Sequence, residues 1–410
     1  MRLMQIIEQI TKNNAGILDN QSDLQKICSE KFSANSIPNK KSEIWRLASK
    51  TKFSRFLDFK YSAKYHKPSI PGRSGGKNIL RIIIGENQKF NIKKEKWEIK
   101  EIEKQTLLDL IKKKIINCDP TENWSNLLNH SLTDIQNIIG LSISGREIPD
   151  IEIVSNSKNN NFNSKTIILN IEKSTEVNIT QIHLGDENSS LSTSSYLNIE
   201  ENSKLNHGII SCGKNKSNVI NTLDVTQNKN SEYNLGTLQF SFDFARFEIS
   251  INQIEGDAKT NIKGMQITKN NEQISTYAKI TFNGSNGFLD QLNKSLANDK
   301  SHCVFEGLII VPQIAQKTDA SQLSRNLLLS NYAKIDTKPQ LEIIADDVKC
   351  MHGATISQLD ENEVFYMRSR GLTLAEASKL QLRSYYQEII SFLPISKKRW
   401  DLLALLLNDK

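Results

Sequence analysis

The stretch LQFSFDFARFEISI, Leu238–Ile251, decides the fold of this chain because its apolar residues alternate along the sequence, as they do in a β-strand. The alternation keeps one phase up to Phe244 and takes the opposite phase from Phe247 onward. A change of phase at Ala245–Arg246 predicts a bend or a β-bulge at this point, which would keep the apolar side chains facing inward. The stretch therefore predicts β-structure with a corner.

The same pattern extends in both directions, from about Ile143 to Ile344, through many short segments separated by Asn, Gly and Ser. A run of strands without intervening helices is compatible with a sandwich, a barrel or a β-solenoid. The recurring Asn residues favour the solenoid, because Asn side chains at stacked corners can form hydrogen-bonded ladders. No repeat of fixed length is visible, so periodicity alone leaves the three architectures open.

Helical patterns flank the β-rich stretch on both sides. We expect a helical or mixed region at residues 1–142, a β core at 143–358 and a helical region at 359–410. In the last region Thr373 and Glu376 form a capping box that begins a long amphipathic helix. Its apolar side chains would either pack on the β core or dock a partner protein. The candidate docking residues are Leu374, Leu380, Tyr385 and Ile389.

Composition restricts the class of protein. The net charge of +7 could suggest nucleic acid, but the lysines are interspersed with Asn, Glu and Asp, so solvated surface is the better interpretation and no nucleic acid is expected. No apolar run reaches the ~18 residues of a membrane span. The start, Met1–Asn13, is amphipathic and unlike a signal peptide. We expect a cytoplasmic protein without membrane insertion.

The five cysteines are scattered and contain no C-x-x-C pair, which argues against a disulfide framework. The string GIISCGKN, Gly208–Asn215, matches a phosphate-binding loop except that Asn215 replaces the Ser or Thr that would hold magnesium. A strand pattern, not a helix, follows Lys214, so the phosphates would meet no helix N-terminus. We expect no ATP site in this chain.

A thiol and an imidazole lie two residues apart in ADDVKCMHGAT, Ala345–Thr355. In a strand, Cys350 and His352 project from the same face, so both could bind one metal ion. Tetrahedral iron or zinc sites normally have four ligands, and no other Cys or His is near in sequence. The remaining ligands would come from elsewhere. The alternative is that Cys350 is a small core residue and His352 a hydrogen-bonded structural residue.

The segment Gln313–Thr355, which ends in ADDVKCMHGAT, and VFYMRSRGL, Val364–Leu372, resemble the SufB/SufD core family of iron–sulfur cluster assembly scaffolds. Its SufD branch fits best, because that branch has the form ADDVKC-x-HGAT. One element departs from the branch: Ser275–Phe288 lacks the histidine of a D-x-x-x-x-x-H pattern. The resemblance implies a mainly β fold whose core is a right-handed parallel β-helix, flanked by N-terminal and C-terminal α-helical segments.

The resemblance also implies a function. It indicates a non-catalytic scaffold subunit that pairs with a SufB-like paralogue and docks a SufC-like ATPase through the C-terminal helices. His352 would be an interface ligand of a transient iron–sulfur cluster shared with the partner, and Cys350 is the weaker candidate. The alternative is a β-helix carbohydrate-active enzyme similar to polysaccharide lyases. Assays on uronic-acid polymers and a search for a co-purifying ATPase would discriminate between the two.

Overall fold

The computed structural model describes residues 19–33, 43–47, 52, 60–61, 67–68, 78–86, 90–395 and 399–408. The amphipathic stretch at Met1–Asn13 lies outside these residues. The helices are α2 Asp19–Ser33, η1 Glu43–Trp45, α4 Lys104–Ile116, α5 Trp124–Leu132, η2 Ile135–Asn137, α6 Glu361–Ser369, α7 Leu374–Ile390 and α8 Leu402–Asn408. None of these described helices is long and apolar enough to cross a membrane.

Strands β5 to β20 form the body of the molecule. They are β5 Ile138–Gly145, β6 Asp150–Ser157, β7 Asn161–Ile171, β8 Glu176–Gly185, β9 Ser190–Ile199, β10 Lys204–Cys212, β11 Asn218–Gln227, β12 Glu232–Phe240, β13 Phe244–Gln253, β14 Lys259–Thr268, β15 Gln273–Phe282, β16 Phe288–Ala297, β17 His302–Val311, β18 Asp319–Leu328, β19 Lys334–Ile343 and β20 Lys349–Ser357. The smaller strands before them are β1 Lys60–Tyr61, β2 Ile79–Ile83, β3 Ile92–Lys93 and β4 Trp97–Glu101.

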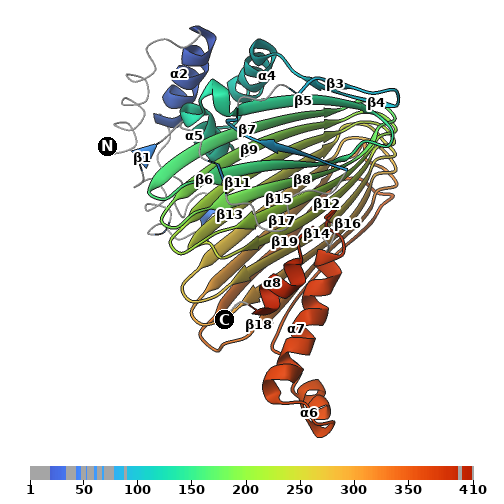
Figure 1. Cartoon of the computed structure of the whole chain (residues 1–410). Coiled ribbons are helices and arrows are strands. Elements are labelled where there is room, and N and C mark those ends of the chain that lie inside the picture. Colours follow the sequence, from blue (N-terminus) through green and yellow to red (C-terminus); the bar gives the residue numbers. More distant parts are fainter. Residues whose placement is uncertain are drawn as a thin grey trace.

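The chain alternates between two parallel sheets, which makes a β-solenoid (Figure 1). Odd-numbered strands from β5 to β19 lie in one sheet, here called sheet A, and even-numbered strands from β6 to β20 lie in the other, sheet B. Each coil contributes one strand to each sheet, so β5 to β20 make eight coils. The prediction of a mainly β chain with a parallel β-helix core is confirmed, and the sandwich and the barrel are excluded.

The coils differ in length, which explains why the sequence shows no fixed repeat. Asn218 pairs with Phe244, 26 residues further on, whereas His302 pairs with Lys334, 32 residues further on. The strands nevertheless keep their register, because the extra residues are placed in the corners. A sequence search for one constant period therefore fails even though the stacking is regular.

Corners and asparagine ladders hold the coils together. Among the residues that the structure describes, thirteen other than glycine have positive φ, and most corners hold one of them. Asn is the commonest type, because its short polar side chain tolerates the left-handed region. The ladder through Asn178, Asn206, Asn234 and Asn261 links four successive strands of sheet B by amide hydrogen bonds of 2.8–2.9 Å. The expected asparagine ladders are therefore present, although this one runs inside the strands and not at the corners.

The prediction of a bend at Ala245–Arg246 is wrong. The chain turns earlier, at Ser241, which has a φ of 61°, and β13 then runs without interruption through Arg246. The apolar phase changes because Phe244 lies on the outer face of sheet A under the N-terminal helices, whereas Phe247 points into the solenoid. Both faces of the strand are covered, so alternation does not distinguish inside from outside.

The two ends of the solenoid differ. At the N-terminal end β4 pairs antiparallel with β5, β3 pairs with β4, and β2 extends sheet B beside β6. Buried side chains from this region, Ile82, Ile84, Phe90 and Ile99, join the interior core and close that end. At the other end β19 and β20 are the last strands of their sheets among the described residues. One end of the solenoid is capped and the other is open.

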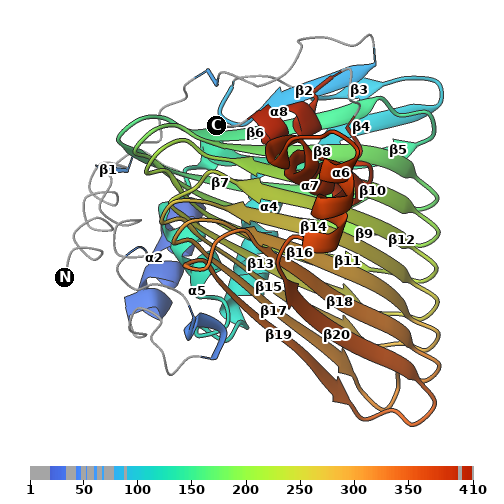
Figure 2. The same cartoon turned by 90° about the horizontal axis from the view of Figure 1, so that it is seen from below.

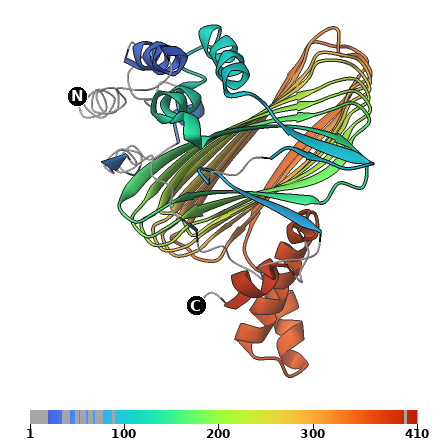
Figure 3. The ribbon, with the colours of Figure 1, turned by 45° about the horizontal axis from the view of Figure 1, so that its top comes forward.

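Helices cover the outer faces of the two sheets from opposite sides (Figure 3). Helix α5 packs on β7, β9 and β11 of sheet A, and α7 packs on β12 and β14 of sheet B. The predicted capping box of Thr373 and Glu376 at the start of α7 is confirmed, and α6 ends at Ser369, two residues before Gly371, whose φ is 95°. Figure 2 shows α7 lying across the strands of sheet B while α2 and α5 lie on the other side.

Candidate functional site

The open end of the solenoid is an exposed surface of backbone edges and apolar side chains. Strand β19 pairs only with β17, and β20 pairs only with β18 within the described part of the chain. Ile344 is 65% exposed and Met351 is 61% exposed, and Ile343 and Ile356 are exposed as well. A strand edge with apolar side chains is a template for pairing with another chain, so this end is suited to a protein partner.

His352 lies on this open end. Strand β20 stays in register with β18, which places His352 beside Gln322, a side chain buried inside the solenoid. The strand does not bend at Gly353, so His352 faces the interior side of its strand. It is exposed because no further coil follows β20 within the described residues. A partner that covers the open end would therefore also cover this imidazole.

Cys350 lies two residues earlier on the same face of β20. It is half-buried and packs against the interior core, and it pairs in register with the buried Ala320. Burial raises the pKa of its thiol, and the nearby carboxylate of Asp319 raises it further. A protonated thiol is a poor metal ligand, so His352 is the better candidate of the two at neutral pH.

The described residues of this chain do not complete a metal site. No cluster of three or more His, Cys, Asp or Glu side chains with suitable geometry occurs among them. All five cysteines are free in this structure. A cluster bound at His352 would need ligands from a second chain.

The four candidate docking residues of α7 separate into two groups. Leu374 is 57% exposed and Leu380 is 44% exposed, whereas Ile389 is fully buried against sheet B. Tyr385 is half-buried, and its hydroxyl donates a hydrogen bond of 2.6 Å to the carbonyl of Arg325. Ile389 and Tyr385 therefore attach α7 to its own core, and the surface left for a partner is the end of the helix near Leu374.

Helix α6 enlarges this surface, and the sequence reasoning missed it. None of its residues is buried, and Phe365 and Tyr366 are 73% and 59% exposed. An open groove of about 970 Å³ lies between α6, the start of α7 and the corners after β16 and β18, and Phe365 and Leu374 line it. The adjacent aromatic residues Phe365 and Tyr366, within the apolar run Val364–Met367, were the available signal, but they did not show which side chains the core would leave uncovered.

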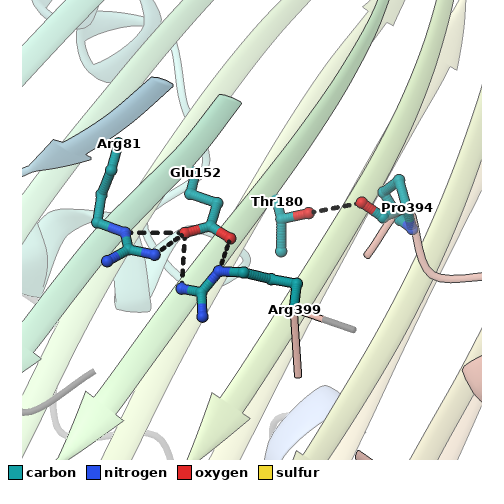
Figure 4. Close-up of polar contacts among 5 residues, drawn as sticks. All are labelled: Arg81, Glu152, Thr180, Pro394 and Arg399. Carbon is teal, nitrogen blue, oxygen red and sulfur yellow. Dashed lines mark hydrogen bonds and ion pairs between the residues drawn. The ribbon is translucent and has the colours of Figure 1, made fainter. Parts of the chain in front are cut away.

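The C-terminal segment is held on sheet B by a buried ion-pair network, which was also missed (Figure 4). Arg399 donates to both carboxylate oxygens of Glu152, at 2.8 and 3.0 Å, and Arg81 donates to Glu152 Oε2 at 2.7 and 2.9 Å. The side chains of Glu152 and Arg399 are each 4% exposed. A charged residue within the apolar strand IEIV was the sequence signal for a buried pair.

Small residues on sheet B let this segment approach closely. A Cβ atom on Gly208 would lie 2.9 Å from Pro394 Cδ, and one on Gly236 would lie 2.9 Å from Leu393 Cδ2. Thr180 donates a hydrogen bond to the carbonyl of Pro394, also drawn in Figure 4. The string Gly208–Asn215, rejected as a phosphate loop, is the end of β10 and a corner that leads into β11, not into a helix.

Comparison with known proteins identifies the family. A family model described as the SUF system FeS cluster assembly SufBD core domain matches residues 153–385, more than half of the chain. The chain belongs to the SufBD core family. The match begins in β6 and ends in α7, so the family domain contains most of the solenoid, the open end and His352.

Three relatives illustrate the similarity. The chain is 42% identical over 152 residues to an iron–sulfur cluster assembly SufBD family protein of Synechocystis sp., covering 37% of this chain and 34% of the relative. It is 41% identical over 140 residues to the iron–sulfur cluster assembly protein SufD of Escherichia coli, covering 33% of each. It is 30% identical over 153 residues to the SufD of Bacillus subtilis, covering 37% of this chain and 34% of the relative. The similar stretch thus spans about a third of each curated relative.

Proposed function

We propose that this chain is a non-catalytic scaffold subunit, similar to SufD, of a cytoplasmic SufBCD-type complex that assembles iron–sulfur clusters. It would pair with a SufB-like paralogue through the open end of its solenoid and dock a SufC-like ATPase on α6 and the start of α7. The observation that carries the proposal is that His352 lies, within a SufBD core domain, on an apolar strand edge that no other described strand pairs with.

The chemistry at the open end supports a shared site. An imidazole is a suitable ligand for iron, and thiolates and carboxylates supplied by a second chain would make a mixed ligand set. The nascent cluster would be cargo, held between two subunits and released to an acceptor. Because this chain offers one good ligand and one protonated thiol, the isolated subunit is not expected to hold a stable cluster.

The position of the groove supports ATPase docking. Helix α6 extends away from the solenoid (Figure 1), so a globular partner can reach Phe365 and Leu374 without touching the strands. Exposed apolar side chains of this size at a helix pair are typical of a protein interface. ATP hydrolysis by the partner would then act on the scaffold through α7, which packs on β12 and β14.

Replacing His352 by alanine is expected to lower the iron affinity of the whole complex by at least about tenfold, because a ligand is removed. The fold should lose less than about 0.5 kcal/mol, since the side chain is exposed. The measurement is iron bound per complex after anaerobic purification with the neighbouring subunits, together with the thermal midpoint. Cys350→Ser is the control for the weaker ligand and should reduce iron less.

A lower midpoint with normal iron per folded complex would show that His352 is structural, and the proposal for this site would be wrong. Loss of the paralogue from the His352→Ala complex would also count against a ligand role. It would mean that the imidazole contributes to pairing and not to the cluster.

Replacing Leu374 by glutamate is expected to weaken ATPase docking by about 30-fold, the effect of removing about 2 kcal/mol from an interface centre. Ile254→Glu is the matched control, because Ile254 is 42% exposed but lies at a corner far from α6 in sequence and on no helix. The measurement is the dissociation constant between the purified chain and the ATPase. Equal binding by both variants would exclude the groove as the docking site.

A further inference from the structure

A column of polar side chains runs along the interior of the solenoid on sheet B. The register between successive even-numbered strands places one inward-facing polar residue at the same position in seven coils. All seven are buried, and the same interior also contains the apolar core of Ile, Leu, Val and Phe side chains. The residues are Ser155, His183, Ser211, Gln239, Gln266, Ser295 and Asn326.

Sheet A presents a second polar column opposite the first, formed by Lys165, Thr193, Asn221, Thr276 and Thr337 and interrupted by Phe247 and Phe305. Side chains bond between the two columns. Asn221 donates to Ser211 Oγ at 3.0 Å, Gln239 donates to Thr276 Oγ1 at 3.2 Å, and Thr276 donates to Gln266 Oε1 at 3.1 Å. We call the two columns together the polar seam.

The polar seam leaves specific atoms unpaired. Ser155 Oγ, Gln239 Oε1 and Asn326 Oδ1 are buried and have no hydrogen-bond partner among the residues that the structure describes. Gln181 Nε2, beside His183, is also buried without a hydrogen-bond partner among the described residues. Each such atom costs about 1–3 kcal/mol if it stays unpaired, and buried water normally removes this cost.

The chemistry of these atoms distinguishes between possible occupants. Two are carbonyl oxygens that need a donor, one is an amide N–H that needs an acceptor, and one is a hydroxyl that can do either. A metal cation could not accept a hydrogen bond from Gln181 Nε2. No carboxylate lies in the seam to balance a cation, and the pKa of His183 is lowered to about 4 by burial, so its ring is neutral. Water meets all four requirements.

We propose that the polar seam binds internal water at three separate levels: at Ser155 and Gln181 near the capped end, at Gln239 in the middle, and at Asn326 near the open end. Neighbouring strands are about 4.8 Å apart, and three coils separate Ser155 from Gln239 and Gln239 from Asn326, so these are distinct sites and not one continuous file. The inference does not depend on the proposed function, because it concerns this chain alone.

The test is a high-resolution crystal structure of the full chain, combined with water ¹⁷O relaxation dispersion, which counts long-lived internal waters. We expect ordered water within hydrogen-bond distance of Gln239 Oε1, Asn326 Oδ1 and Gln181 Nε2. The variant Gln239→Met should lose the middle water and no other. Leu235→Met is the matched control, since Leu235 lies on the same strand and also faces the interior but packs in the apolar core.

Two results would overturn the proposal. One is an electron-density map in which a protein group, reached by rotation of an amide, occupies the place of each expected water. The other is a Gln239→Met variant that keeps the full number of long-lived waters. If Gln239→Met does not fold, the map and the relaxation data of the unaltered chain decide the matter without it.

Discussion

Replacing Glu152 by alanine is expected to destabilise the protein by about 3–5 kcal/mol, the usual effect of removing one partner from a buried ion pair. The buried guanidinium of Arg399, whose side chain is only 4% exposed, would lose the carboxylate of Glu152. The segment 399–408 would then separate from sheet B, since hydration of the guanidinium favours its exposure. The measurements are the free energy of unfolding by denaturant and hydrogen exchange in α8.

Glu147→Ala is the matched control, because Glu147 forms an ion pair of 2.7 Å with Lys96 in which both side chains are more than half exposed. Exposed pairs contribute about 0–1 kcal/mol, so this variant should resemble the unaltered protein. The double variant Glu152→Met with Arg399→Met should recover much of the lost stability, because apolar residues of similar volume often replace buried pairs without cost. Equal unfolding energies for Glu152→Ala and the control would mean that the network does not anchor the segment.

Lowering the pH from 7.5 to 5 is expected to destabilise the fold by about 3 kcal/mol, well before most carboxylates titrate. Burial lowers the pKa of His130 and His207 to about 3 and that of His183 to about 4. In the unfolded chain these groups bind a proton near pH 6.5, whereas the folded protein does not, so stability is lost as the pH falls below that value. At pH 5 each histidine accounts for about 2 kcal/mol.

Glu272 has the opposite effect on stability: it stabilises the fold as the pH falls. Burial raises its pKa to about 7, so the folded protein takes up a proton between pH 7 and 4.5 that the unfolded chain does not bind. This offsets about 3 of the 6 kcal/mol lost at the three histidines. The variant Glu272→Gln should therefore show a steeper loss of stability between pH 7.5 and 5. Denaturant midpoints at a series of pH values measure both slopes, and a flat profile for the unaltered protein would contradict the burial of the histidines.

The part of the fold that could be predicted follows from local pattern. Short stretches of sequence predict the strands, the capping box of Thr373 and the presence of asparagine ladders. They left the sandwich, the barrel and the solenoid open, and the family resemblance was needed to favour the β-helix. The prediction of a bend at Ala245–Arg246 failed, because Phe244 is covered by helices that lie far away in the sequence, and the local pattern does not show this. Alternation reports which side chains are covered, and it cannot report what covers them.

The candidate site also shows that a local sequence pattern cannot predict which side chains the rest of the fold covers. The spacing of Cys350 and His352 correctly places them on one face of a strand, but only the ending of sheet B after β20 exposes the imidazole. The candidate docking residues of α7 share a helical pattern in sequence, yet the contacts of Tyr385 and Ile389 with sheet B remove these two from the surface. The network of Arg81, Glu152 and Arg399 joins residues up to 318 positions apart, which no local pattern can indicate.

The open end of the solenoid has a consequence for how much of the protein a cell can safely produce. A newly made chain carries two sheets whose last strands, within the part that the structure describes, offer unpaired N–H and C=O groups beside exposed Ile344 and Met351. Such an edge does not discriminate strongly between the proper partner, a second copy and the strand of an unfolding neighbour. Surplus subunits would therefore be a source of aggregation. If a partner chain covers this end as proposed, synthesis in balance with that partner, for example from one messenger RNA, would limit this aggregation.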